Sequence, residues 1–368
     1  MQRRAACQQS NPRTPPCHPS LKNHQITVIW FTFVSLAIIT MMITLAFIVI
    51  AVFIWGSLAL WVQFTRQKAR RGVLIALWAL VSALFVAALF YPAVDLLQTI
   101  AGISYTLSVL ALVYWWRNIR PSNDRNWIPD VSRQAHGSLS GNVITIENVR
   151  NFTWHCPERF TEQWETRQYD LSKLASVDLA LSYWSGPAIA HALVSFGFND
   201  GQYLVFSVEI RRKVGDAFSE LGGFFKMYEL SIVAADEKDV LFVRSNIRQE
   251  EGYLYRVHMT PAARQSLLLA YLDEANRLTH TPRFYHTITG NCTTLIFRMM
   301  DRIVPGLPLN WRLLASGYLP EYLHKVGALQ GADSVAEYRK RGRYTDRARA
   351  LPDSSGYSRV IRDGVPGI

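Results

Sequence analysis

The chain has 368 residues, of which 49% are hydrophobic, and its formal net charge is +11 at pH 7. Residues 1–125 contain eleven Lys or Arg and two acidic residues, so nearly all of the excess charge lies there. A nucleic-acid-binding protein places its basic patch on the folded domain, whereas these basic residues flank apolar runs. The composition therefore argues against nucleic acid as a partner and points to membrane lipids.

Residues 1–25 have no apolar periodicity and are predicted to be a disordered, basic leader. Met41 or Met42 is an alternative translation start, which would leave a more ordinary first apolar segment. A cleaved signal peptide is not expected, because no small-residue cleavage site follows a short apolar core.

Three apolar runs make up the membrane region predicted at residues 26–116. Residues 26–62, 72–94 and 96–116 contain no charged side chain. A helix needs about 20 residues to cross the hydrocarbon core of a bilayer, and aromatic residues stand at the ends of these runs, as in interfacial belts. Three transmembrane helices are therefore predicted, although the first run is nearly long enough for two crossings.

The orientation of the chain in the membrane is ambiguous from charge alone. Basic residues crowd positions 66–71 and recur at Arg117, Arg120 and Arg125. With three spans these two segments lie on one side, and the positive-inside tendency places both in the cytoplasm. Charge therefore favours a cytoplasmic C-terminal domain.

A soluble domain is predicted at residues 136–368, after a linker at 117–135 that contains two prolines and polar turn residues. Strand-like patterns, with period-two alternation at 142–149 and 202–210, predict strands at the following positions: 142–149, 188–198, 202–210, 239–244 and 252–258. A helix is expected to follow Thr260 as N-cap and Pro261 at its first position and to run to residue 278. The predicted fold class is α+β, an antiparallel sheet with helices packed on it.

Cys292 is the first candidate for chemistry, in the stretch TGNCTTLI at residues 289–296. It opens an apolar helical pattern directly after Asn291. Unpaired N–H groups at a helix N-terminus favour a thiolate and lower the pKa of a cysteine placed there. The same N–H groups can stabilise an oxyanion. The stretch lacks a base, which has to come from elsewhere in the chain.

His191 is the candidate base, because it interrupts the apolar strand pattern AIAHALVSF just before the predicted hairpin turn at 199–201. Ser207, Glu209 and Arg211 alternate along the next strand, where they would share one face. They could orient the imidazole or bind a polar head group. The same pattern is also expected at the end of a strand whose charged side chains form an ion pair or face solvent.

The residues alone leave Cys292 open to two less reactive roles. An isolated buried cysteine is more often inert than reactive. A disulfide with Cys156 can form if the domain lies outside the cytoplasm. No CxxC, HxxxH or HExxH spacing occurs, so neither a metal nor another cofactor is expected.

A series of blocks resembles the family of membrane-anchored bacterial proteins named after the extracytoplasmic catalytic domain of the lipoprotein N-acyltransferase Lnb. The resemblance covers about residues 130–368. The blocks are NVRNF (148–152), YDLSKL (169–174), YWSGPAIAHALVSFGF (183–198), YLVFSVEIRRKVGDAFSELGGFFKMYEL (203–230), ADEKDVLFVRSN (235–246), YHTITGNCTT (285–294) and YSRVIRDGVPG (357–367).

This resemblance implies a permuted papain-like thiol fold of the NlpC type, in which the histidine precedes the cysteine in the chain. It also implies Cys292 as nucleophile and His191 as base. Supporting or substrate-binding roles fall on the remaining matched residues, namely Ser207, Glu209, Arg211, Tyr285 and Asn291.

The implied activity is that of a thiol-dependent acyltransferase or hydrolase acting on a lipidated substrate such as a lipoprotein. The family further implies a multi-pass protein of the bacterial inner membrane with a periplasmic catalytic domain. This location conflicts with the basic loop at 66–71. Two further functions are open: an NlpC-type peptidoglycan amidase or peptidase, and a membrane-anchored domain that binds a partner or lipid without catalysis.

Overall fold

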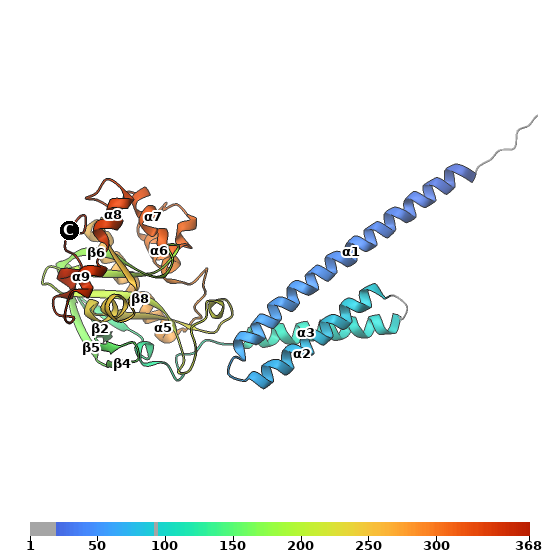
Figure 1. Ribbon diagram of the computed structural model, residues 1–368, viewed down its shortest axis with the longest axis horizontal. Coiled ribbons are helices and arrows are strands. Elements are labelled where there is room, and N and C mark those ends of the chain that lie inside the picture. Colours follow the sequence, from blue (N-terminus) through green and yellow to red (C-terminus); the bar gives the residue numbers. More distant parts are fainter. Residues whose placement is uncertain (1–19, 92–94) are drawn as a thin grey trace, which may run out of the picture. The chain divides into compact units, whose positions relative to one another are not determined.

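The computed structural model describes residues 20–91 and 95–368, and these fall into two compact units divided between Trp116 and Arg117 (Figure 1). Residues 1–19, which hold most of the predicted leader, lie outside the described residues.

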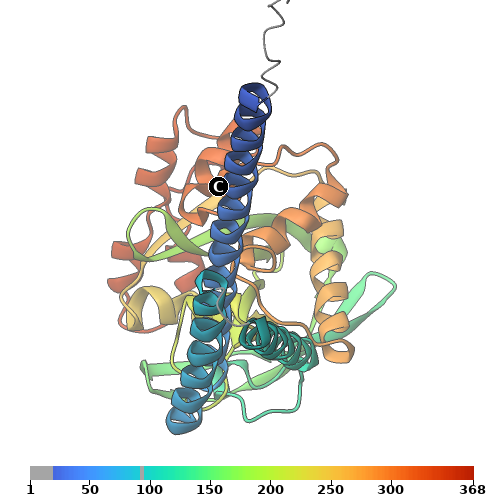
Figure 2. The same cartoon turned by 90° about the vertical axis from the view of Figure 1, so that its right-hand side faces the viewer.

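Three helices form the first unit: α1 (Ser20–Gln63), α2 (Lys68–Phe90) and α3 (Asp95–Asn118). All three contain a segment long and apolar enough to cross a membrane, which in α1 is Thr32–Gln63. The first apolar run is thus one continuous helix (Figure 2). The helix begins at Ser20, so residues 20–25 are helical and not part of an irregular leader; no Gly or Pro in this stretch opposes helix formation.

The three helices pack through aromatic rings and one close approach. The indole N–H of Trp78 in α2 donates to the Phe53 carbonyl in α1 at 3.1 Å, and the Trp78 ring stacks on Tyr105 of α3 at 5.7 Å. The close approach is between α1 and α3 at Gly56, because a Cβ there would lie 2.7 Å from the side chain of Leu112. Small residues serve the same purpose in membrane helix pairs.

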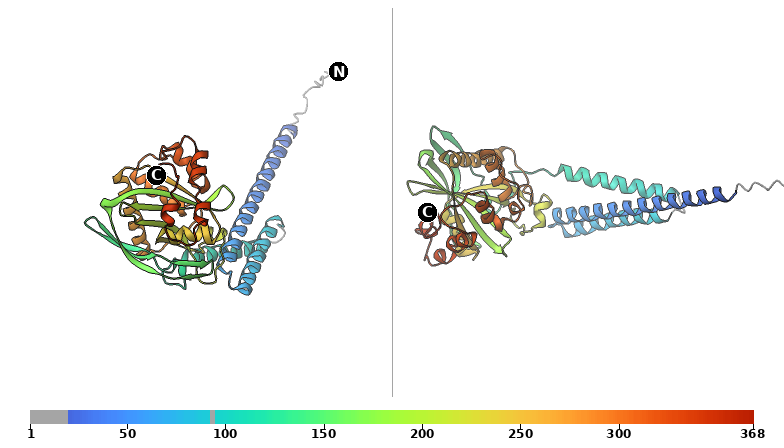
Figure 3. Two further views of the ribbon diagram at one scale, coloured as in Figure 1. Left: turned by 60° about the vertical axis from the view of Figure 1, so that its left-hand side comes forward. Right: turned by 90° about the horizontal axis from the view of Figure 1, so that it is seen from above.

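An eight-stranded sheet forms the centre of the second unit (Figures 1 and 3). The strands follow the order β1-β2-β9-β8-β7-β6-β10, and β5 also pairs with β2. All pairs are antiparallel except one parallel bridge between β2 and β9. The bounds are β1 His136–Ser140, β2 Val143–Arg150, β5 Trp164–Asp170, β6 Leu174–Ser185, β7 Ile189–Phe198, β8 Tyr203–Arg211, β9 Glu229–Ala235 and β10 Glu251–Val257. A separate hairpin is formed by β3 (Thr153–Cys156) and β4 (Arg159–Thr161).

Helices cover both faces of the sheet. The long helix α5 (Pro261–His280) and α6 (Cys292–Ile303) pack on the face that carries Phe196 and Phe206, where Tyr271 stacks on Phe206 at 4.9 Å. The opposite core contains Val205, Val233 and Leu254 and is closed by short helices. The remaining helices are α4 Glu237–Val240, α7 Leu319–Lys325, α8 Val335–Gly342, α9 Thr345–Arg349 and α10 Tyr357–Val360. The predicted α+β class with an antiparallel sheet and packed helices is confirmed, while the permuted papain-like arrangement stays a prediction.

One predicted strand is wrong. Residues 239–244 form the end of α4 and the start of a π-helical turn, Val243–Ile247. Asp236 caps α4 by accepting from the Lys238 N–H, and the buried Asp239 accepts two bonds from Arg150 at 2.8 and 3.0 Å. A short apolar run such as VLFV does not distinguish strand from helix, and these tertiary bonds select the helix.

The segment predicted as a linker packs on the soluble domain. Trp127 is buried, and the Ile128 N–H donates to the Arg212 carbonyl at 3.0 Å. The Asn123 amide donates to the carbonyls of Leu278 and Thr279 at the end of α5. These contacts fix residues 123–128 beside β8.

Candidate functional site

The site lies where two neighbouring strands stop pairing with each other. The register between β7 and β8 ends at Leu193 and Ser207, although β7 begins at Ile189 and β8 continues to Arg211. His191 and Glu209 therefore lie on strand ends whose backbones do not pair with each other. The N-terminal end of α6 packs beside them, because Cys292 belongs to the same core cluster as Ala192 and Val208.

His191 is held by two groups on β8. Its Nε2 lies 2.7 Å from the Ser207 hydroxyl oxygen and 3.2 Å from Glu209 Oε1. Ser207 has a single O–H, and it donates this hydrogen to Glu209 at 2.6 Å. The Ser207 oxygen must therefore accept from His191, so Nε2 carries a hydrogen and Nδ1 is the ring nitrogen not engaged by β8.

Cys292 occupies the first position of α6, as predicted. Asn291 is the N-cap: its side-chain oxygen accepts from the Thr294 N–H at 2.8 Å, and the Asn291 N–H donates to the Thr294 hydroxyl at 3.0 Å. This reciprocal capping box fixes where the helix starts. Asn291 also donates to the Thr287 carbonyl at 2.7 Å, so its contacts orient the loop and helix around the buried thiol.

Electrostatic interactions couple the thiol and the imidazole. Burial raises the pKa of Cys292, but the hydrogen bond and charge of His191 and the Ala192 N–H outweigh it, so the pKa lies below its ordinary value. Burial and the Arg244 charge lower the pKa of His191, yet Glu209 and the bond to Cys292 raise it to about 9. Both directions favour a thiolate beside an imidazolium at neutral pH.

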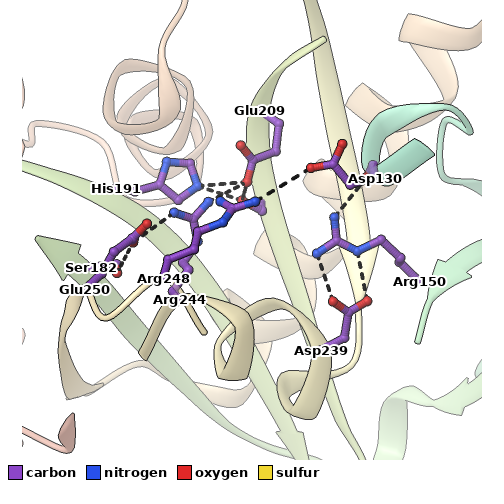
Figure 4. Close-up of polar contacts among 10 residues, drawn as sticks. Asp130, Arg150, Ser182, His191, Glu209, Asp239, Arg244, Arg248 and Glu250 are labelled. Atoms are coloured by element: carbon purple, nitrogen blue, oxygen red, sulfur yellow. Dashed lines mark hydrogen bonds and ion pairs between the residues drawn. The ribbon is translucent and has the colours of Figure 1, made fainter. Parts of the chain in front are cut away.

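A chain of partly buried ionic contacts continues behind His191 (Figure 4). Arg244, from the π-helical turn, donates to Glu209 at 2.9 Å and to Glu250 at 3.2 Å. Glu250 in turn accepts from the Ser182 hydroxyl at 2.5 Å. Burial raises the pKa of Glu209, but His191 and Arg244 overcome this and hold it well below its ordinary value. Glu209 is therefore a carboxylate, which is the form that supports a charged imidazole.

The sequence pattern does not single out Arg244, Glu250 or Ser182. Arg244 and Ser182 lie in or beside blocks that resemble the family, but nothing in their spacing connects them with His191. They come from segments that meet only in the folded sheet: the π-helical turn, the residue before β10, and β6. The position of Arg244 between the carboxylates of Glu209 and Glu250 can be recognised only in the folded structure.

Arg211 lies apart from this group. Its guanidinium donates to the carbonyls of Val131 and Ser132 at 2.9 and 2.6 Å and to the Asn123 side chain at 2.9 Å. The guanidinium also stacks over the Trp127 ring at 4.5 Å. Arg211 therefore fastens residues 123–132 to the end of β8, and its donors do not face His191.

A cleft of about 610 Å³ opens over Cys292 and His191. Tyr285 lines this cleft, and burial and the charges of Cys292 and Glu209 raise its pKa, so its hydroxyl keeps its hydrogen. Within the described residues no group takes that hydroxyl as a hydrogen-bond partner. Apolar side chains make much of the remaining wall, namely Trp184, Ile189, Phe218, Phe224 and Leu314.

The structure also tests whether Cys292 forms a disulfide and whether a metal could bind. Cys156 and Cys292 are both free, which rules out the disulfide between them in this structure. Cys156 lies in the β3–β4 hairpin, where its thiol contacts the Glu158 carboxylate. Among residues 20–91 and 95–368, no group of three His, Cys, Asp or Glu is arranged to hold a metal ion.

The fold and site together define an α+β domain with a cluster of the buried Cys292 and the partly buried His191 and Glu209, in a chain that also carries three helices long and apolar enough to span a membrane. Residues 160–317 match the family model described as the Lnb N-terminal periplasmic domain. The match includes Cys292, His191, Ser207 and Glu209, and it confirms the resemblance over these residues. The comparisons with curated proteins and with solved structures gave no match.

Proposed function

We propose that this protein is a membrane-anchored, thiol-dependent acyltransferase or hydrolase that acts on a lipidated substrate in the periplasm. The observation that carries the proposal is the Cys292–His191–Glu209 cluster at the base of a partly apolar cleft. The match to the Lnb N-terminal periplasmic domain supports a lipoprotein as the substrate. We infer acyl transfer within it, from its glycerol to the amine of its N-terminal cysteine.

The reaction runs in two stages. The Cys292 thiolate attacks the ester carbonyl carbon and forms a C–S bond, while His191 Nδ1 gives its proton to the departing glycerol oxygen as the C–O bond breaks. In the second stage the acceptor amine, or water, attacks the acyl-thioester. Neutral His191 takes a proton from the attacking group, and the C–S bond breaks to restore the thiolate.

Two sets of donors can stabilise the oxyanion formed in each stage. The N–H groups at the start of α6 point out of the helix end that carries Cys292. The Tyr285 hydroxyl faces the same cleft and stays protonated because its pKa is raised. The Ala192 N–H contacts the sulfur and so stabilises the thiolate itself.

The lining of the cleft favours an acyl substrate over a peptidoglycan peptide. Trp184, Phe218 and Phe224 present aromatic surface to the cleft, and an acyl chain gains free energy by contact with such surface in proportion to the area buried. A cell-wall peptide offers mainly polar groups. The peptidoglycan amidase therefore remains the second candidate, supported only by the thiol chemistry.

An acyl-thioester activity probe tests whether the chemistry exists. The full chain in membranes is treated with the probe and the labelled residue is identified by mass spectrometry. We expect labelling of wild type and of Cys156→Ala, because Cys156 does not line the cleft, and loss of labelling in Cys292→Ala. Labelling that persists in Cys292→Ala, or is absent from folded wild type, overturns the proposal.

The product then identifies the reaction. Mass spectrometry of a diacylated model lipopeptide, with and without the protein, should show one acyl chain moved from glycerol to the amine at constant total mass. Loss of the acyl chain indicates hydrolysis instead. A periplasmic reporter fused after residue 368 tests the side of the membrane on which the domain lies, where the basic loop at 66–71 and the family match disagree.

A further inference from the structure

Exposed apolar side chains of the soluble domain gather around the cleft. All but four of the large exposed apolar residues in 117–368 lie on four loops, and the four exceptions are Leu139, Val143, Val304 and Ile368. The loops span residues 184–189, 212–228, 284–291 and 305–316, the first counted with the ends of β6 and β7 that flank it, and each contributes side chains to the cleft wall. We call the exposed apolar residues of these four loops the apolar rim.

The four loops hold one another in place. The Gly317 N–H at the end of the last loop donates to the Ala188 carbonyl of the first at 3.0 Å. The Thr287 N–H of the third loop reaches the Gly223 carbonyl of the second at 3.4 Å, and the rings of Phe224 and His286 meet edge to face at 5.7 Å. The apolar rim is therefore built from two pairs of loops, each held together by these contacts, that line one cleft.

The rim contains the most exposed large apolar side chain of the domain, Leu309, at 83%. Trp311 is 57% and Phe218 56% exposed. Apolar surface concentrated in this way marks a site of interaction with a partner or a membrane. Two tryptophans, Trp184 and Trp311, are side chains enriched at the boundary between water and hydrocarbon.

Two features of the same chain point to the lipid bilayer as the partner that covers the apolar rim. Only four residues separate Asn118, where α3 ends, from Asn123, which bonds to the end of α5. The tether between a membrane helix and the domain is therefore short, about 18 Å even when extended. The four loops also carry more basic than acidic residues: Arg212, Lys213, Lys226 and Arg312 against Asp216 and Glu220. An excess of positive charge is attracted to anionic lipid head groups.

We infer that the apolar rim inserts into the surface of the bilayer that holds the three helices, with the mouth of the cleft against the lipid. The side chains of the rim then lie among the acyl chains, and an ester at the head-group level can enter the cleft without crossing water. This inference rests on the proposed function for the nature of the ester, but insertion itself does not require catalysis.

Photocrosslinking of the full chain in lipid nanodiscs tests the insertion. A benzoyl-phenylalanine replaces Leu221 or Leu309 in the rim, or Leu139 as a control of similar exposure on the β1–β2 hairpin; Leu221 is 51% and Leu139 46% exposed. We expect lipid adducts at both rim positions at least about fivefold above those at Leu139, since side chains held among acyl chains meet lipid continuously. Equal yields at the three positions, or adducts to a second copy or another protein in place of lipid, overturn the inference.

The same measurement in a Cys292→Ala background separates insertion from chemistry. Lipid adducts at the rim should persist there, so a failure of the thiol mechanism leaves this test intact. In the active protein, Leu309→Asp should lower turnover of a vesicle-embedded ester at least about tenfold, because a charge opposes insertion, and leave a soluble short-chain ester unaffected. Leu139→Asp should change neither, and equal effects of the two substitutions on the vesicle substrate contradict the inference.

Discussion

Two buried ionic clusters lie in the soluble domain, and they differ in how completely their charges are used. In the first, Arg362 donates to Asp178 at 2.8 and 3.0 Å and to Glu237 at 2.6 and 2.8 Å, and none of the three lines the cleft. In the second, His191 and Glu209 line the cleft and adjoin the reactive thiol. The first cluster is closed upon itself, whereas the second keeps groups available to a substrate.

This difference separates residues that support the fold from residues that support chemistry. Removing a member of the closed cluster leaves buried charges without partners, so stability should fall. Removing a member of the open cluster takes away a proton donor or a donor to the oxyanion, so the rate should fall more than stability. Four substitutions test this division.

His191→Ala should have the largest effect on activity. It removes the proton donor and acceptor of both stages, for which losses of about 10²–10⁴-fold are typical. Turnover of a lipid ester by the reconstituted protein measures it, together with thermal unfolding to show that the variant is folded. His136→Ala, a partly exposed histidine on β1, is the matched control and should retain full activity. Comparable losses in both variants would contradict the assigned role of His191.

Arg362→Ala should cause the largest loss of stability. Asp178 and Glu237 are fully buried, and breaking a buried ion pair from one side costs about 3–5 kcal/mol. Chemical denaturation of the full chain in detergent measures the change in the free energy of unfolding. Arg359→Ala, an exposed arginine in the adjoining short helix α10, should change it by less than about 0.5 kcal/mol. Equal stability of the two variants would show that the closed cluster does not support the fold.

Tyr285→Phe should lower kcat by about 10²-fold, the usual consequence of losing one donor to an oxyanion. KM and the free energy of unfolding should change little, because the hydroxyl has no partner within the described residues. Steady-state kinetics separates the two parameters. An increase in KM with unchanged kcat would instead assign Tyr285 to substrate binding.

Glu209→Gln should have the smallest effect on the rate at neutral pH but a clear effect on the pH profile. The imidazolium form of His191 is present below its pKa of about 9 and is lost as pH rises through it. The Glu209 charge helps to raise that pKa, so the basic limb of activity should move to lower pH in the variant. Rates between about pH 6 and 10 measure the limb, and an unmoved limb would mean that Glu209 does not control the protonation of His191.

The sequence predicts the parts of this site whose signals are local. Cys292 at a helix start and His191 in an apolar strand pattern are both identifiable, and α6 begins at the predicted residue. The alternation puts Glu209 and Ser207 on one strand face, and both contact His191. Arg211 follows the same alternation, but the packing of residues 123–132 against the free end of β8 directs it elsewhere.

The features that the sequence does not reveal depend on contacts between distant segments. The short apolar run within residues 239–244 resembles a strand. The segment is helical because Asp239 bonds to Arg150, which lies 89 positions away in the sequence. Strand β6 is not predicted either, because it contains the buried Asp178, which is tolerated only beside Arg362 and Arg256. Local propensity carries no information about such partners.

The bond between Asp178 and Arg362 also bears on how the protein is made. It joins residues 184 positions apart in the sequence. Until synthesis has passed Arg362, Glu237 lacks its arginine partner and Asp178 is paired only with Arg256. We therefore expect the sheet that carries His191 to reach its full stability only when translation has almost finished.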